Sequence, residues 1–109
     1  MKIFKELKKL GYIHYSATTI EELDDLPLNS AERISEQALV LRWFREKYNL
    51  FCEIQIDRTT APKFCFNIFQ YEHFGNYEEI RIGEWYLYRT QEEAEIECLK
   101  ELIEIVKRK

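Results

Sequence analysis

Apolar and polar residues alternate along two stretches of the chain, residues 50–57 and residues 63–71. Because successive side chains of a strand point to opposite faces, this alternation predicts two half-buried β-strands. The inward-facing positions are Cys52, Ile54, Ile56, Phe64, Phe66 and Ile68. A third strand is predicted over residues 77–88, with a bend or bulge at Gly83.

Helical periodicity predicts two long helices, one before and one after these strands. Asn29 or Ser30 begins the first, which runs to about Tyr48, while Thr90 caps the second with Glu93 at the capping-box position. The core-facing stripe of the first helix is Ile34, Ala38, Leu41, Phe44 and Tyr48. That of the second is Ile96, Leu99, Leu102, Ile103 and Val106.

Residues 1–28, which we call the leader, have a weaker pattern. Apolar residues at helical spacing predict a short amphipathic helix that stops at Gly11. Residues 12–15 are consistent with a short strand, and Thr18 or Thr19 caps a further helical turn. We expect the leader to pack on the rest of the chain.

These elements predict one α+β domain over residues 1–109, since 109 residues is a common length for a single domain. The expected core, residues 29–109, is a two-layer α-β-β-β-α unit. Its three strands form an antiparallel meander, because the connections between them are short, and two long helices flank the sheet.

Charge and cysteine content narrow the function classes. The net charge of -4 gives a field that repels phosphate backbones, so nucleic acid is an unfavourable partner. No apolar run approaches the ~20 residues that cross a bilayer. The absence of a CxxC pair and of a signal-peptide pattern predicts a cytoplasmic protein in which Cys52, Cys65 and Cys98 are reduced core residues.

No residue pattern predicts a catalytic, cofactor or metal site. His14 and His73 lack a second ligand at helical spacing. Cys52 and Cys65 fall in the middle of predicted strands, whereas nucleophiles tend to lie at strand ends and in loops. Adjacent acidic residues rarely face one target, so the acidic pairs indicate a solvated surface.

Aromatic residues make up 15% of the chain and supply the candidate interaction surface. Leu39 and Trp43 project from the first long helix almost opposite its core stripe. The remaining candidates lie on the outward side of the predicted sheet or near its third strand, among polar residues. The full set is Leu39, Trp43, Phe51, Phe69, Tyr71, Tyr77, Tyr86 and Tyr88. Two interpretations fit: the leader covers this surface, or a protein partner or a second copy does.

The order of elements over residues 29–107 resembles the double-stranded RNA-binding domain. That family contacts RNA phosphates through lysines at the start of its last helix. Here those positions are Gln91, Glu92 and Glu93, so the resemblance implies a shared topology without the activity.

Two motifs are similar to those of small uncharacterised proteins from phages and prophages of gut Bacteroidetes. They are Trp-Phe-Arg-Glu-Lys at residues 43–47 and Thr-Gln-Glu-Glu-Ala at residues 90–94. This resemblance brings no established activity with it.

The sequence therefore favours a non-enzymatic, phage-derived module that binds a protein partner or itself through an aromatic surface, without a cofactor. One alternative is a small enzyme or ligand-sequestering protein with a pocket between leader and sheet. The other is a nucleic-acid-binding module that uses its basic chain ends.

Overall fold

The helices and strands of this chain are known from a computed structural model that describes residues 2–15, 17–57, 63–71, 77–81 and 88–108. In chain order they are α1 (Ile3–Lys9), α2 (Ile20–Asp25), α3 (Ala31–Tyr48), β1 (Leu50–Asp57), β2 (Lys63–Tyr71), β3 (Tyr77–Arg81) and α4 (Gln91–Lys107).

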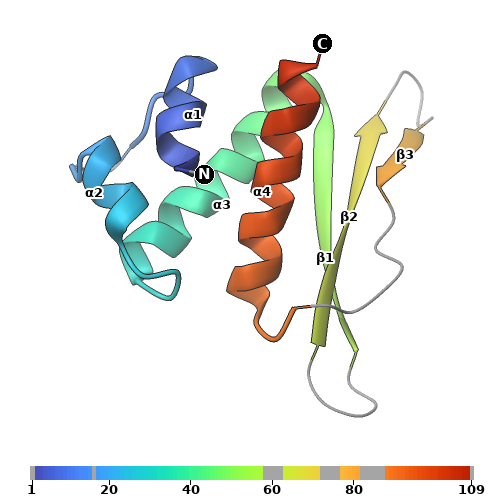
Figure 1. Cartoon of the computed structure of the whole chain (residues 1–109). Helices are drawn as coiled ribbons and strands as arrows, with labels where there is room; N and C mark the ends of the chain where they lie inside the picture. Colours follow the sequence, from blue (N-terminus) through green and yellow to red (C-terminus); the bar gives the residue numbers. More distant parts are fainter. Residues whose placement is uncertain (1, 16, 58–62, 72–76, 82–87, 109) are drawn as a thin grey trace.

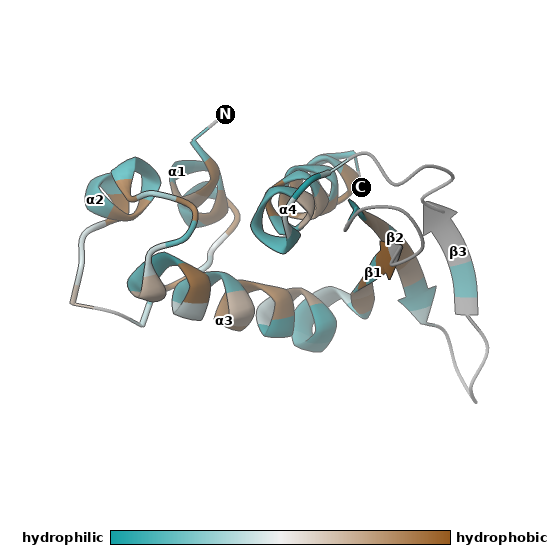
Figure 2. Ribbon diagram, turned by 90° about the horizontal axis from the view of Figure 1, so that it is seen from below, coloured by the Kyte–Doolittle hydropathy of each residue, from teal (hydrophilic) through white to brown (hydrophobic). Residues whose placement is uncertain are grey.

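Helix α4 lies between the leader helices and the sheet (Figures 1 and 2). It contacts both β1 and β2 on one side and α1 on the other. The apolar positions predicted to face the core are buried in α4, which confirms its stripe. Helix α3 runs past α4, from the leader to the start of β1 (Figure 2). One continuous apolar core therefore joins the leader, both long helices and the sheet.

The predicted architecture of a three-stranded meander flanked by two long helices is wrong, although its α+β, two-layer character is compatible with the structure. The described residues contain four helices. Their sheet is in essence an antiparallel hairpin of β1 and β2, paired along its whole length from Leu50 opposite Gln70 to Asp57 opposite Lys63. Only the five residues of β3 are added at the other edge of β2.

The register of β3 with β2 is interrupted. Pairing shifts between Ile68 and Phe69, and Arg81 lies opposite Ile68. Further along, Tyr88 forms an isolated antiparallel bridge with Phe64 through two backbone hydrogen bonds. The bend predicted at Gly83 lies outside the described residues.

The predicted helix caps are confirmed where the structure describes them. In each case a side-chain oxygen accepts a hydrogen bond from the backbone N–H three residues later, which satisfies a group that the helix leaves without a partner. The caps are Thr19 for α2, Ser30 for α3 and Thr90 for α4. Helix α3 ends at Asn49, whose left-handed φ of 55° suits asparagine. The short strand predicted over residues 12–15 is not formed.

Hydrogen bonds join the two leader helices to each other, and an ion pair joins α1 to the C-terminal end of α4. Asp24 of α2 accepts hydrogen bonds from the backbone N–H groups of Phe4 (2.8 Å) and Lys5 (3.1 Å), and so caps the start of α1. Glu6 of α1 forms an ion pair with Lys107 of α4 at 2.7 Å. The leader thus packs on the helices and not on the outer face of the sheet (Figure 1).

Helix α3 buries a different face from the one predicted. Phe44 is fully buried, but Ile34 is 36% exposed and Ala38 is also exposed. The buried residues are instead Arg33, Glu36, Gln37, Val40 and Phe44. The stripe is rotated toward polar positions because the leader and α4 supply hydrogen-bond partners for them.

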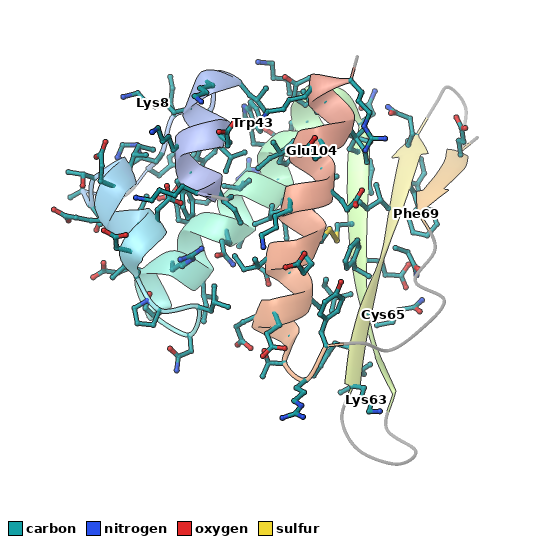
Figure 3. All side chains as sticks on the ribbon, in the orientation of Figure 1. Lys8, Trp43, Lys63, Cys65, Phe69 and Glu104 are labelled. Carbon is teal, nitrogen blue, oxygen red and sulfur yellow. A yellow bond between two sulfur atoms is a disulfide. The ribbon has the colours of Figure 1, made fainter. Side chains whose placement is uncertain are left out.

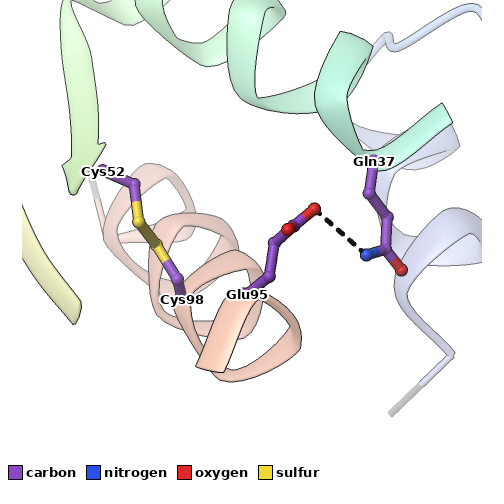
Figure 4. The surroundings of a disulfide bond; sticks show 4 residues. All are labelled: Gln37, Cys52, Glu95 and Cys98. Atoms are coloured by element: carbon purple, nitrogen blue, oxygen red, sulfur yellow. Dashed lines mark hydrogen bonds between the residues drawn. A yellow bond between two sulfur atoms is a disulfide. The ribbon is translucent and has the colours of Figure 1, made fainter. Parts of the chain in front are cut away.

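The prediction that all three cysteines are reduced is also wrong. Cys52 of β1 and Cys98 of α4 are joined by a disulfide that links the sheet to its covering helix (Figure 4). Cys65 is a buried thiol on β2.

Candidate functional site

The outer face of the hairpin is the face turned away from α4. Cys52 points toward α4 through its disulfide, so its neighbours Phe51 and Glu53 must point to the opposite side. Phe69 lies directly opposite Phe51 in the register of β1 with β2. The alternation of the two strands therefore places these side chains together on one surface.

A hollow of about 350 Å³ lies on this surface, lined by Phe51, Cys52, Glu53, Phe69 and Tyr71. We call it the sheet hollow. The rings of Phe51 and Tyr71 meet nearly edge to face, with centroids 4.5 Å apart. This arrangement is favourable for aromatic pairs, because the positive edge of one ring meets the negative face of the other. The walls of the hollow are therefore mainly aromatic.

One acidic group and one phenol give the sheet hollow its polar character. Glu53 is exposed, and the amide of Gln55 donates a hydrogen bond to its carboxylate at 3.2 Å. Tyr71 is 41% exposed. The hollow thus combines apolar walls with a solvent-accessible negative charge.

Among the described residues, the aromatic surface does not extend along the whole face of the hairpin. Cys65 and Asn67 occupy the middle outward positions of β2, and both are buried. Cys65 contacts the side chain of Gln55 through its thiol, at 3.8 Å. Figure 3 shows Cys65 and Phe69 at different heights along β2. The accessible aromatic site is therefore limited to the end of the hairpin nearest Tyr71.

The remaining aromatic candidates near the third strand do not join this site within the described residues. Tyr88 stacks on Phe66 with ring centroids 6.0 Å apart, and it is packed against the core. Tyr86 and the side chain of Tyr77 lie outside the described part of the chain.

Leu39 and Trp43 lie on α3, away from the sheet hollow. Trp43 is half-buried, and its ring contacts Tyr12 (5.5 Å between centroids) and Tyr48 (5.5 Å). The ammonium of Lys47 lies 5.1 Å from the same ring. The leader therefore covers one side of Trp43 through Tyr12, while Leu39 stays half-exposed. The predicted surface is thus divided between two elements.

Helix α3 also carries a group of buried polar side chains that the sequence pattern did not predict. Arg33 is 7% exposed and donates hydrogen bonds to the backbone carbonyls of Asp24 (3.2 Å) and Leu26 (2.8 Å), as well as to the side chain of Gln37 (2.9 Å). Burial lowers the pKa of its guanidinium, although the nearby carboxylate of Asp24 opposes this shift. Arg33 therefore joins the end of α2 to α3 through hydrogen bonds.

Gln37 continues this network to the last helix. Its amide donates a hydrogen bond to Glu95 of α4 at 3.3 Å (Figure 4). Burial raises the pKa of Glu95, and the bond from Gln37 only partly offsets this. The spacing of these residues could have revealed the group. Arg33, Gln37, Val40 and Phe44 are three or four positions apart, so they lie on one face of the helix.

Glu36 anchors the segment that follows α1. It is 2% exposed and accepts hydrogen bonds from the hydroxyl of Tyr12 and from the backbone N–H of Tyr15 (3.1 Å). Burial, followed by the hydrogen bond to Glu36, raises the pKa of Tyr12. These contacts hold the leader against α3, so the buried polar groups have a structural role.

Stability should consequently fall at alkaline pH. Because the pKa of Tyr12 is higher in the folded chain, its contribution is complete below the unfolded pKa of about 10 and decreases above it by about 1.4 kcal/mol per pH unit. Urea unfolding measured from about pH 9 to about pH 11, a range that brackets the unfolded pKa, should show stability falling toward this slope. It should be smaller in Tyr12→Phe but kept in the control Tyr48→Phe, and an equal slope in both variants would contradict the assignment.

Comparisons with known proteins identify no relative: no protein-family model, curated protein or solved structure matches the chain. Over the described residues, no group of three or more His, Cys, Asp or Glu side chains is placed to hold a metal ion. No helix in that part of the chain is both long and apolar enough to span a membrane. The sheet hollow must therefore be interpreted from its own geometry.

Proposed function

We propose that this chain is a non-enzymatic protein-interaction module and that the sheet hollow is its binding site. The observation that supports the proposal is that Phe51, Phe69 and Tyr71 line one hollow together with the exposed Glu53. Aromatic residues are enriched at protein interfaces, where a rigid ring gives a large contact area at a low entropic cost.

The chemistry of the hollow favours a basic partner with an apolar anchor. Its volume of about 350 Å³ is at the lower end for binding pockets, so it suits a side chain or two and not a large cofactor. Glu53 and the net charge of -4 attract cations. Arginine and lysine also bind favourably over aromatic rings. We therefore expect a partner segment in which Arg or Lys stands next to a large apolar residue.

The resemblance to phage and prophage proteins suggests that this partner is a host or phage protein. The two alternative functions have less support. Glu92 and Glu93 lie in the first turn of α4, where an RNA-binding surface of this type would need positive charge. The other alternative places a pocket between leader and sheet, whereas α4 lies between these two parts (Figure 1).

A random peptide library displayed against the immobilised chain would test the proposal. The wild type should enrich peptides in which a basic residue adjoins a large apolar residue. Phe51→Ala and Tyr71→Ala should each weaken binding of a selected peptide by about 2 kcal/mol, or roughly 30-fold, as truncation of an interface hot spot does. Glu53→Gln should reduce the preference for Arg and Lys.

The matched control is Tyr15→Ala, which removes an exposed aromatic ring from another part of the molecule. Peptide binding should be unchanged in this variant. Enrichment of the same peptides by Phe51→Ala and by the wild type would place the binding site elsewhere and would refute the proposal.

A further inference from the structure

Strand β1 lies at one edge of the sheet, whose strand order is β1-β2-β3 (Figure 1). Its eight residues pair with β2 without interruption, so the strand is regular from Leu50 to Asp57. Edge strands are commonly protected from further pairing by proline, by lysine or by a β-bulge. β1 has none of these devices, so its free backbone groups are suited to pair with another strand.

The hydrogen bonds of β2 show which residues of β1 face away from it. Tyr71 donates its backbone N–H to the carbonyl of Asn49, directly opposite, at 3.0 Å. Phe64, which lies opposite Ile56, instead uses both of its backbone groups to bond Tyr88. Bonded and non-bonded pairs alternate in an antiparallel ladder, so every second residue of β1 directs its N–H and C=O groups away from β2. We call the backbone groups of Leu50, Cys52, Ile54 and Ile56 the β1 edge.

The β1 edge is accessible beyond its first residue. Leu50 is fully buried, whereas Cys52 and Ile54 are half-buried. Ile56 is 40% exposed. The side chains of Ile54 and Ile56 point to the same face as Cys52, so apolar surface is left uncovered beside the edge. Within the described residues, no strand lies next to β1 on this side.

We propose that the partner segment binds as an added strand along the β1 edge. This inference rests on the proposed function and specifies how the backbone of the partner is held. Cys52 belongs to the β1 edge and also lines the sheet hollow, so one extended segment can reach both. Its backbone pairs with the free N–H and C=O groups of Cys52, Ile54 and Ile56, while its side chains give specificity.

Side-chain alternation along the added strand explains why its basic and apolar residues should be neighbours. The residue opposite Glu53 points to the outer face and reaches the sheet hollow. Among the described residues that line the hollow, Glu53 alone is charged, and the amide of Gln55 that bonds it is neutral. Lys or Arg at that position therefore meets an opposite charge. The next residue points to the other face, where an apolar side chain covers the exposed parts of Ile54 and Ile56.

Charge favours a basic segment over a second copy of this chain at the β1 edge. The sequence of β1 contains acidic residues and no basic residue. Two β1 strands side by side would therefore bring together like charges, which is unfavourable. A segment that carries Lys or Arg brings the opposite charge.

Backbone N-methylation of a peptide selected by the wild-type chain would test this mode of binding. Each methyl group removes one N–H donor and leaves every side chain in place. Methylation at every second position of the paired stretch, one position at a time, should weaken binding about tenfold or more, because those N–H groups face the β1 edge. Methylation at the positions between them should have little effect, since those N–H groups face solvent. Isothermal titration calorimetry measures each peptide.

Ile54→Pro makes the corresponding change in the protein. Proline lacks the N–H that Ile54 directs to the β1 edge, and the ladder with β2 does not use that donor. Ile54→Val is the matched control, because it keeps the N–H and also shortens the half-buried side chain. Peptide binding should fall about tenfold in Ile54→Pro and remain close to wild type in Ile54→Val. Circular dichroism verifies folding, and the methylated peptides test the wild-type chain if the proline variant does not fold.

Equal binding of all the singly methylated peptides would overturn the proposal. Equal binding by folded Ile54→Pro and Ile54→Val would overturn it as well. In both cases, loss of binding in Phe51→Ala would still support the sheet hollow as the binding site. If the wild-type chain selected no peptide, both proposals would be overturned. A wild-type dimer that Ile54→Pro dissociates would place a second copy at the β1 edge and would also contradict binding of a basic segment there.

Discussion

Reduction of the Cys52–Cys98 disulfide is expected to lower the free energy of unfolding by about 4 kcal/mol. The two cysteines are 46 residues apart, so the bond closes a long loop in the unfolded chain and removes much of its conformational entropy. A loss of this size is a large fraction of the ~5–15 kcal/mol by which domains are stable. Urea unfolding with and without a reductant measures it directly.

Matched cysteine variants separate this effect from other actions of the reductant. The double variant Cys52→Ala with Cys98→Ala should unfold at the same urea concentration with or without reductant. Cys65→Ala keeps the disulfide and should remain sensitive. Equal midpoints for the reduced and oxidised wild type would contradict the prediction. Because cytoplasmic thiols are kept reduced, a cytoplasmic location would remove this contribution in the cell.

Arg33→Ala is expected to destabilise the protein by about 3 kcal/mol. The substitution removes the donor to two backbone carbonyls at the end of α2, and it leaves the side-chain oxygen of Gln37 without its bond from the guanidinium. Buried acceptors that lose their donors keep the full cost of desolvation. The guanidinium also lies 5.8 Å from the ring of Phe4, a contact that disappears as well. Urea unfolding again provides the measurement.

Two further variants make this prediction specific. Arg45→Ala removes an exposed arginine from the same helix and should change stability by less than about 0.5 kcal/mol. Arg33→Lys keeps the charge but lacks the planar fork that reaches several acceptors, so an intermediate loss is expected. If Arg33→Ala and Arg45→Ala were equally stable, the network around Arg33 would not hold the leader in place.

The ends of β1 and β2 could be predicted from the sequence because side-chain alternation determines both the strand and its inward face. Helix starts were equally visible, since Ser30 and Thr90 satisfy backbone groups that every helix leaves without a partner. The interrupted register of the third strand could not be predicted, since the pairing of β3 with β2 shifts between Ile68 and Phe69. Alternation within one strand does not reveal such a shift, because register is a property of two strands together.

The buried face of α3 could not be predicted from apolar periodicity. Arg33, Glu36 and Gln37 are buried because Tyr12, Asp24 and Glu95 come from other elements to bond them. From sequence alone a polar residue is expected at the surface, because it is buried only where other parts of the chain supply hydrogen-bond partners. The disulfide was missed for the same reason, because sequence spacing does not reveal that β1 and α4 bring two thiols together.

The candidate surface was predicted in part. Phe51, Phe69 and Tyr71 do lie together, as the alternation of β1 and β2 requires. Leu39 and Trp43 lie on α3, away from the sheet hollow. Only the arrangement of elements in space separates the two.

The cap that Asp24 gives to α1 has a consequence for how the N-terminal region opens. A seven-residue helix is not stable alone in water. The entropy lost in forming its first turn exceeds the free energy gained from its few backbone hydrogen bonds. With its first amides held by α2, α1 can form only when α2 is already in position. The two segments must therefore melt and refold as one cooperative unit, with closely similar protection of their amides from hydrogen exchange.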